Sequence, residues 1–200
     1  MTISTMCPKT PKQNQAMRKE SRQKIQDAAF ELFAKRGYAN TSISAIAQKA
    51  DISKGLIYHY FDSKEAILDA IFHQWVEATD YIMEFSDDLS ANQKLRQMIN
   101  ELFTFIKENP ESSRLLTVLA LQPDAIAALK SQVKQVTLKQ IEIGMSILEE
   151  LDYRNPETEA YFLGAKLDGI TLGYLTLGDD YPLEAMKQKL LEEYVPDEDD

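Results

Sequence analysis

The sequence predicts an all-α protein of about nine helices. Apolar residues recur at the three- and four-residue spacing of helices along most of the chain, and no stretch reads convincingly as a strand. Hydroxyl and proline residues stand where new helices would begin. With 200 residues, 44% of them hydrophobic, the chain is long enough to bury a sizeable core.

The first predicted helix runs from about residue 18 to residue 36. Its inward face is apolar: Ile25, Ala29, Leu32 and Phe33. Gly37 supplies a C-terminal stop, because glycine readily takes the conformation that ends a helix. We expect residues 1–17 and the acidic residues 196–200 to be disordered tails.

Two short helices joined by a tight turn are predicted between about Ile43 and Asp62. Thr41 and Ser42 stand where the first of them would be capped, and Ser53 can cap the second. On a helical wheel, Ile57 and Phe61 form an inward face of the second helix. The opposite face is polar and aromatic: Gly55, Tyr58, His59 and Asp62.

These residues resemble the helix-turn-helix of the TetR family of bacterial transcriptional regulators. The matching strings are Phe30 to Phe33 with Gly37-Tyr38, Thr41-Ser42, Ile46-Ala47, Ser53 to Gly55, Tyr58 to Phe61, and Ser63 to Glu65. So many matches in order over about fifty residues are specific, whereas a bare helical hairpin, the alternative interpretation, is common in all-α proteins. Leu56 departs from the family, which often has a small polar residue there.

The resemblance implies DNA binding by a defined set of residues: Thr41, Ser42, Ser53, Lys54, Gly55, Leu56, Tyr58, His59, Tyr60 and Lys64. Within this set, we expect phosphate contacts from Lys54, Tyr58, Tyr60 and Lys64. Gly55 would permit close approach of the helix. Leu56 and His59 would read base edges.

Charge is divided unevenly along the chain. Residues 1–75 carry 11 Lys and Arg against 7 Asp and Glu, and residues 76–200 carry 11 against 25. The segregation favours two domains, a DNA-binding domain over residues 18–64 and a second domain over residues 65–195. Four basic residues early in the first helix are expected to contact phosphate: Arg18, Lys19, Arg22 and Lys24.

The remaining helices are predicted from their first residues. Ser63 would cap a fourth helix that ends near residue 84, and Ser90 would open a fifth that ends near Asn109. Four prolines stand where the last four helices would begin: Pro110, Pro123, Pro156 and Pro182.

Residues 157–178 contain small residues every four positions, and such a strip lets two helices approach closely. The segment resembles the dimerisation region of many TetR-family proteins, in which the last two helices of two subunits form a four-helix bundle. The resemblance implies a homodimer interface formed by Ala165, Gly169, Leu172, Gly173 and Leu190. The alternative is that the strip packs within one subunit.

Aromatic and methionine residues lie on the helices that surround a ligand cavity in the family. The expected ligand-binding residues are Trp75, Tyr81, Phe103, Met145, Tyr161 and Tyr174. Ordinary core packing is the alternative for each of them. A mostly apolar lining would select a small apolar effector.

The sequence gives little support to an enzyme. His59 and His73 lie in or beside the basic part, Cys7 lies near the N-terminus, and no nucleophile, metal-ligand or dinucleotide pattern is present. We therefore expect no catalytic residues, no metal and no cofactor. No long uncharged apolar run is present, so a cytoplasmic protein without a membrane span is expected.

The function predicted is a ligand-responsive regulator, more often a repressor, that binds a pseudo-palindromic operator. Control by a protein partner or a role in nucleoid organisation is the alternative.

Overall fold

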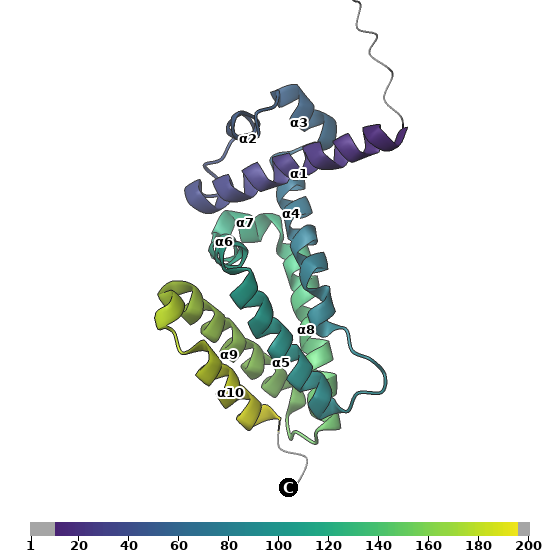
Figure 1. Cartoon of the computed structure of the whole chain (residues 1–200), viewed down its shortest axis with the longest axis vertical. Coiled ribbons are helices and arrows are strands. Elements are labelled where there is room, and N and C mark those ends of the chain that lie inside the picture. Colours follow the sequence, from purple (N-terminus) through teal and green to yellow (C-terminus); the bar gives the residue numbers. More distant parts are fainter. Residues whose placement is uncertain (1–10, 196–200) are drawn as a thin grey trace, which may run out of the picture. The chain divides into compact units, whose positions relative to one another are not determined.

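The computed structural model describes residues 11–195, which hold ten α-helices and no strand (Figure 1). The all-α prediction is therefore confirmed. The helices are α1 Pro11–Arg36, α2 Ile43–Lys49, α3 Lys54–Tyr60, α4 Lys64–Thr79, α5 Ala91–Glu108, α6 Pro110–Ala120, α7 Pro123–Ala128, α8 Lys130–Glu150, α9 Pro156–Leu177 and α10 Leu183–Tyr194. Two short 3-10 helices are η1 Asp80–Met83 and η2 Gly178–Asp180.

The tenth helix results from a break at Leu129, between α7 and α8. Leu129 has φ −106° and ψ 13°, and its N–H still bonds to the carbonyl of Ala125 at 3.1 Å. No glycine or proline marks this break, so the sequence predicts one helix where the structure has two. The fourth helix also ends earlier than predicted, at Thr79, whose hydroxyl donates to the carbonyl of Trp75 at 3.1 Å.

Helix α1 begins at Pro11, so the expected disordered tail over residues 1–17 is wrong for residues 11–17. Proline is tolerated in the first turn because its missing N–H has no partner there. The following residues, Lys12 to Met17, include no glycine or proline that would stop a helix. The rest of that expected tail, and the one over residues 196–200, lie outside the described residues.

The chain divides into two compact units, residues 1–72 and 73–200, so the boundary falls within α4 and eight residues beyond the predicted one. Unit 1 buries one apolar face from each of its four helices. The buried side chains include Ile25, Ala29, Leu32 and Phe33 of α1, Ile46 of α2, Ile57 of α3, and Ile67, Leu68 and Ile71 of α4. These buried side chains form one shared apolar core, which holds the helices of unit 1 together.

Unit 2 is a helical body whose core comes mainly from α5, α8, α9 and α10. Its buried residues include Leu95, Ile99 and Phe103 of α5, Leu148 of α8, Leu163 and Ile170 of α9, and Leu190 and Tyr194 of α10. Helix α9 packs against both α8 and α10. Pro110, Pro123 and Pro156 begin α6, α7 and α9 as predicted, and Pro182 precedes α10.

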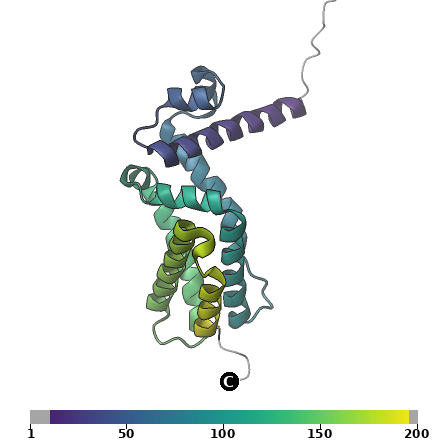
Figure 2. The same cartoon turned by 60° about the vertical axis from the view of Figure 1, so that its left-hand side comes forward.

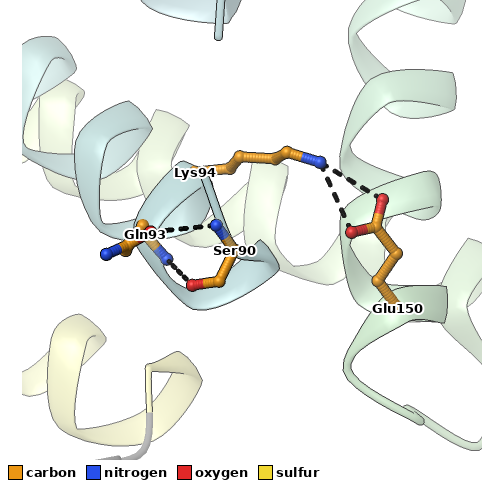
Figure 3. Close-up of polar contacts among 4 residues, drawn as sticks. All are labelled: Ser90, Gln93, Lys94 and Glu150. Atoms are coloured by element: carbon orange, nitrogen blue, oxygen red, sulfur yellow. Dashed lines mark hydrogen bonds and ion pairs between the residues drawn. The ribbon is translucent and has the colours of Figure 1, made fainter. Parts of the chain in front are cut away.

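The start of α5 is fixed by a capping box (Figure 3). The Ser90 hydroxyl accepts from the backbone N–H of Gln93 at 3.3 Å, and the Gln93 side chain accepts from the N–H of Ser90 at 2.9 Å. One turn on, the Lys94 ammonium donates to both carboxylate oxygens of Glu150, at 3.3 and 3.4 Å, and so links α5 to the end of α8. The predicted opening of the fifth helix by Ser90 is confirmed.

Candidate nucleic-acid interface

Helices α2 and α3 are short, and each is fixed by a serine cap. The Ser42 hydroxyl accepts from the N–H of Ala45 at 3.2 Å, and the Ser53 hydroxyl accepts from the N–H of Leu56 at 3.1 Å. Asp51, in the turn between them, has φ +54°, a conformation that aspartate tolerates better than most residues. Both predicted caps are confirmed, although the side chains of Ser42 and Ser53 are thereby engaged within the chain.

The inner side of α3 is anchored to unit 1. Ile57 is fully buried and Phe61 is 4% exposed. The guanidinium of Arg22 donates to the carbonyl of Tyr60 at 3.0 Å and lies 4.4 Å from the centre of the Phe61 ring. Arg22, for which the sequence predicts a phosphate contact, therefore positions the last turn of α3 from α1.

Thr41 does not lie on the outer surface, which corrects the expectation that it contacts DNA. Its side chain is 2% exposed, and its hydroxyl lies 2.9 Å from the carbonyl of Gly37 and 3.3 Å from that of Leu32. A hydroxyl buried on these carbonyls fixes the connection between α1 and α2. It has no path to a phosphate.

Lys64 is likewise engaged within unit 1. Its ammonium donates to the carbonyl of Tyr38 at 2.8 Å and lies 3.4 Å from that of Ala39 and 4.3 Å from the centre of the Tyr38 ring. Through these contacts with backbone carbonyls and the Tyr38 ring, the ammonium stabilises the turn after α1. The ammonium of Lys64 thus supports unit 1, and the phosphate contact that the sequence predicts for it stays a prediction.

A hydrogen bond that the sequence does not predict joins Tyr38 of this turn to Glu65 at the start of α4. Tyr38 is 5% exposed, packs edge-on against Phe33, and donates its hydroxyl to Glu65 at 3.0 Å. The pKa of Glu65 is held below its usual value by its own backbone N–H, the Ser63 hydroxyl and Tyr38, with a smaller contribution from Lys64. The sequence shows that residues 63–65 match the family, but it does not show that Tyr38 is the partner of Glu65.

The outward side of α3 keeps most of the predicted DNA-contacting residues together. Lys54, Gly55 and His59 are exposed, and Tyr58 is 49% exposed. The Lys54 ammonium lies 5.9 Å from the centre of the Tyr58 ring, and the rings of His59 and Tyr60 meet edge-to-face at 5.1 Å. Leu56 and Tyr60 are partly buried. This surface offers a cation, two imidazole nitrogens and two phenol groups to a partner.

Gly55 has no role inside the chain. A Cβ built there would have its nearest neighbour, the Ser53 hydroxyl oxygen, at 4.0 Å, and the backbone does not require glycine. Gly55 is the second residue of α3, and unit 1 gives no steric reason for glycine at this position. The open space leaves room for close approach of an external partner.

Several basic side chains of unit 1 are already paired. Lys24 lies 2.9 Å from Glu20, and Lys35 and Lys49 lie 3.2 and 3.0 Å from Glu31. Lys49, followed by Lys35, holds the pKa of Glu31 below its usual value. Lys24, for which a phosphate contact was predicted, is therefore the partner of a carboxylate, whereas Arg18 and Lys19 are exposed.

The predicted ligand-binding residues do not form one group in unit 2. Phe103 is 3% exposed in the core, and Met145 and Tyr174 pack against that core. Trp75 is partly buried, while Tyr81 and Tyr161 are 43% and 48% exposed. Desolvation, followed by the charges of Glu101 and Glu108, raises the pKa of Tyr81.

The predicted dimer residues divide between the surface and the interior of unit 2. Ala165, Gly169 and Leu172 are exposed on α9, and Leu172 is 48% exposed. Leu190 is 3% exposed in the core, so its side chain is not available to a second subunit. Gly173 faces the ring of Tyr181, which would overlap a Cβ at that position. The small-residue strip thus packs within the subunit at Gly173 and is open at Gly169.

Within residues 11–195, no group of three or more His, Cys, Asp or Glu side chains is placed to hold a metal ion. None of the helices in that described part is long and apolar enough to cross a membrane.

Residues 25–71 match the family of bacterial regulatory proteins named after tetR. The uncharacterized HTH-type transcriptional regulator YuxN of Bacillus subtilis is 43% identical over 61 residues, which are 30% of this chain and 21% of that protein. The HTH-type transcriptional repressor KstR2 of Rhodococcus jostii is 28% identical over 133 residues, 64% of this chain and 63% of that protein. The chain therefore spans less than two thirds of the length of either relative.

Among solved structures, NalD of Pseudomonas aeruginosa, the secondary repressor of the MexAB-OprM multidrug efflux pump, superposes with a TM-score of 0.72 at 19% identity. The superposition covers 89% of this chain and 95% of NalD. At this identity the similarity shows a shared fold over nearly all of both chains.

Proposed function

Because the chain belongs to the TetR family of bacterial transcriptional regulators, we propose that it binds a pseudo-palindromic DNA operator as a homodimer and represses transcription until a small apolar effector binds. The observation that carries this proposal is the outward side of α3. It is anchored from behind by Ile57, Phe61 and Arg22, and it presents a glycine that the fold does not need.

In this proposal α3 enters the major groove, which is wide enough to admit a helix. Leu56 and His59 meet base edges, and Lys54, Tyr58 and Tyr60 hold phosphates on either side. Gly55 lets the first turn of α3 approach the DNA without a side chain between them. Base contacts then supply sequence discrimination, while the phosphate contacts set position and most of the salt dependence.

The homodimer is supported by the exposed side of α9. Tyr161, Phe162 and Leu172 are 48%, 53% and 48% exposed, and Ala165 and Gly169 leave that side smooth between them. Large exposed apolar side chains gathered on one helix are typical of a contact with another protein surface. A two-fold dimer would present two copies of α3, which fit successive major grooves about 34 Å apart.

The effector part of the proposal is supported by Phe103, Met145 and Tyr174, which lie in or against the core of unit 2. A small apolar molecule inserted there would have to move helices of unit 2. Operator affinity falls only if the effector binds the DNA-free conformation more tightly than the DNA-bound one.

Gly55→Ala tests the proposal directly. The new methyl group has room inside the chain and removes the helix cost of glycine, so the variant should fold with equal or greater stability. Its affinity for an operator selected from a random duplex pool should nevertheless fall about tenfold or more, since a clash with the DNA costs more than about 1.4 kcal/mol.

Gly164→Ala is the matched control. Gly164 also lies inside a helix, and a Cβ built there meets nothing within 4 Å. This variant should also fold with equal or greater stability and keep wild-type operator affinity, measured by fluorescence anisotropy. If Gly55→Ala binds DNA as tightly as the wild type, α3 does not approach DNA through its first turn and the proposed mode of binding fails.

A further inference from the structure

Among the described residues, two serine or threonine side chains are buried, and they differ in their hydrogen bonds. Thr41 of unit 1 is 2% exposed, and its hydroxyl bonds to the carbonyls of Gly37 and Leu32. Ser113 of α6, in unit 2, is 7% exposed, and its hydroxyl has no hydrogen-bond partner in the described part of the chain. Burial of an unpaired hydroxyl is unfavourable. Ser113 therefore has a hydrogen-bonding capacity that the fold leaves unused.

The backbone of α6 offers Ser113 a partner that its side chain does not take. A serine or threonine hydroxyl inside a helix can bond to the carbonyl four residues earlier. Thr117 bonds in this way to the carbonyl of Ser113 at 2.9 Å, and Thr171 of α9 has the same kind of bond at 2.8 Å. For Ser113 that carbonyl belongs to Asn109, which accepts from the N–H of Ser113 at 3.0 Å but not from its hydroxyl. The side chain of Ser113 thus does not turn back onto its own helix.

Helix α6 lies against helices that carry apolar residues of unit 2. It packs against α5, α7 and α9, and Figures 1 and 2 show it across one end of α5. Leu116, one turn after Ser113 on the same side of α6, is partly buried. Helices α5 and α9 carry Phe103 and Tyr174, two residues of the proposed effector contact. Because Ser113 is buried, an effector can reach its hydroxyl only by entering between α6 and these helices.

We propose that the Ser113 hydroxyl is the polar anchor of the effector site in unit 2, and that the effector is an apolar molecule with an uncharged oxygen, such as an alcohol or a ketone. This inference rests on the proposed effector response and names the chemical class of the effector. A serine hydroxyl both donates and accepts, so it pairs with either kind of oxygen. Residues 76–200 carry 25 Asp and Glu against 11 Lys and Arg, and this net negative charge disfavours a carboxylate.

Ser113→Ala tests whether the hydroxyl is unused inside the chain. Alanine removes an unpaired polar group and has the higher helix propensity, so the free energy of unfolding should stay equal or rise. Ser112→Ala is the matched control, because Ser112 is exposed on the same helix. Urea unfolding measures both variants. A clear loss of stability in Ser113→Ala that Ser112→Ala does not share would show that the hydroxyl bonds within the chain, and would overturn the anchor.

Three probe series test the chemical class: 1-alkanols, 1-chloroalkanes and alkanoates of six to ten carbons. Affinities follow from the dependence of the melting temperature on probe concentration. The wild type should bind the best alkanol about tenfold more tightly than the chloroalkane of the same length, because only the alkanol bonds to Ser113. That preference should disappear in Ser113→Ala and persist in Ser112→Ala. No response to any alkanol, no preference over the chloroalkanes, a preference that survives Ser113→Ala, or tighter binding of the alkanoates would each overturn the inference.

Operator binding in the presence of the best alkanol separates this inference from the proposed function. The alkanol should weaken operator binding by the wild type, and about tenfold more of it should be needed to weaken binding by Ser113→Ala to the same extent. An alkanol that binds with a preference dependent on Ser113 but leaves operator affinity unchanged would uphold the anchor and overturn the effector response of the proposed function. An alkanol that weakens operator binding equally in both proteins would uphold the response and overturn the anchor.

Discussion

The outward side of α3 and the outward side of α9 each contain a glycine whose Cβ position is open, but their neighbours differ. Around Gly55 lie Lys54, Tyr58 and His59, which offer charge and hydrogen bonds. Around Gly169 lie Leu172 and Ala165, which offer apolar surface, beside the exposed carboxyl group of Asp168. The first set suits phosphates and base edges, and the second suits another protein surface. Open space at a glycine does not by itself mark a contact, since Gly164 is equally open; the neighbours of Gly55 and Gly169 indicate the chemistry of the partner that each side would meet.

Gly173, one turn after Gly169, sharpens this comparison because its space is filled by the ring of Tyr181. Gly173→Leu should displace that ring from its place against the core and lower the free energy of unfolding by about 1–3 kcal/mol. Thermal and urea unfolding measure the loss. In a Tyr181→Ala background the same substitution should cost much less, and an equal cost in both backgrounds would show that the ring is not the obstacle.

Gly169→Leu should give the opposite result. A Cβ at this position meets nothing within 4 Å, so the stability of the monomer should hold or rise. The dimer should weaken, because the larger side chain forces the paired helices apart. Sedimentation at micromolar concentration checks the dimer. A Gly169→Leu dimer of undiminished affinity would place the interface away from this side of α9.

Thr41→Val separates the supporting structure of unit 1 from its DNA-contacting surface. Valine has nearly the same shape but leaves the carbonyls of Gly37 and Leu32 without the hydroxyl, at a cost of about 1–3 kcal/mol in stability. Operator affinity per folded molecule should remain at the wild-type value. Tyr58→Ala should instead leave the stability nearly unchanged and lower the operator affinity, since that side chain is 49% exposed. A Thr41→Val variant that is stable but cannot bind DNA would return Thr41 to the interface.

The sequence predicted where the helices begin better than what their side chains contact. Ser42, Ser53 and Ser90 cap helices because the signal for a cap lies within four residues of the chain. The break at Leu129 had no such local signal.

The structural roles of site residues could not be predicted where their partners are distant in sequence. Lys64 bonds to carbonyls 25 and 26 residues away, and only the folded turn brings them within reach. An exposed lysine beside a helix-turn-helix and a lysine that supports its fold look alike in sequence. Leu190 of α10 was predicted at the dimer interface, but the packing of unit 2 buries its side chain.

Lys54→Met and Lys64→Met form a matched pair, because methionine keeps most of the aliphatic stem and removes the charge. Lys54→Met should make the salt dependence of operator binding shallower by about 0.9 log units per log unit of salt, with little change in thermal stability. Lys64→Met should lower the melting temperature and leave the salt slope unchanged, since its ammonium bonds to Tyr38 and Ala39. The same slope change in both variants would show that Lys64 contacts phosphate after all.

The smallest expected effect is a pH dependence of unit 1. The folded pKa of Glu65 is lowered, so its ionised form stabilises the fold at pH values above the unfolded pKa of about 4.3. That contribution is lost as the pH falls through the folded pKa, because the unfolded state then binds more protons. The difference in unfolding free energy between wild type and Glu65→Gln should be constant near neutral pH and shrink below about pH 4.3.

The control is Glu20→Gln, which removes a fully exposed carboxylate that pairs with Lys24. The difference in unfolding free energy between this variant and the wild type should be smaller at every pH. If the two variants behave alike, the contacts from Tyr38 and Ser63 add nothing to the stability that Glu65 provides.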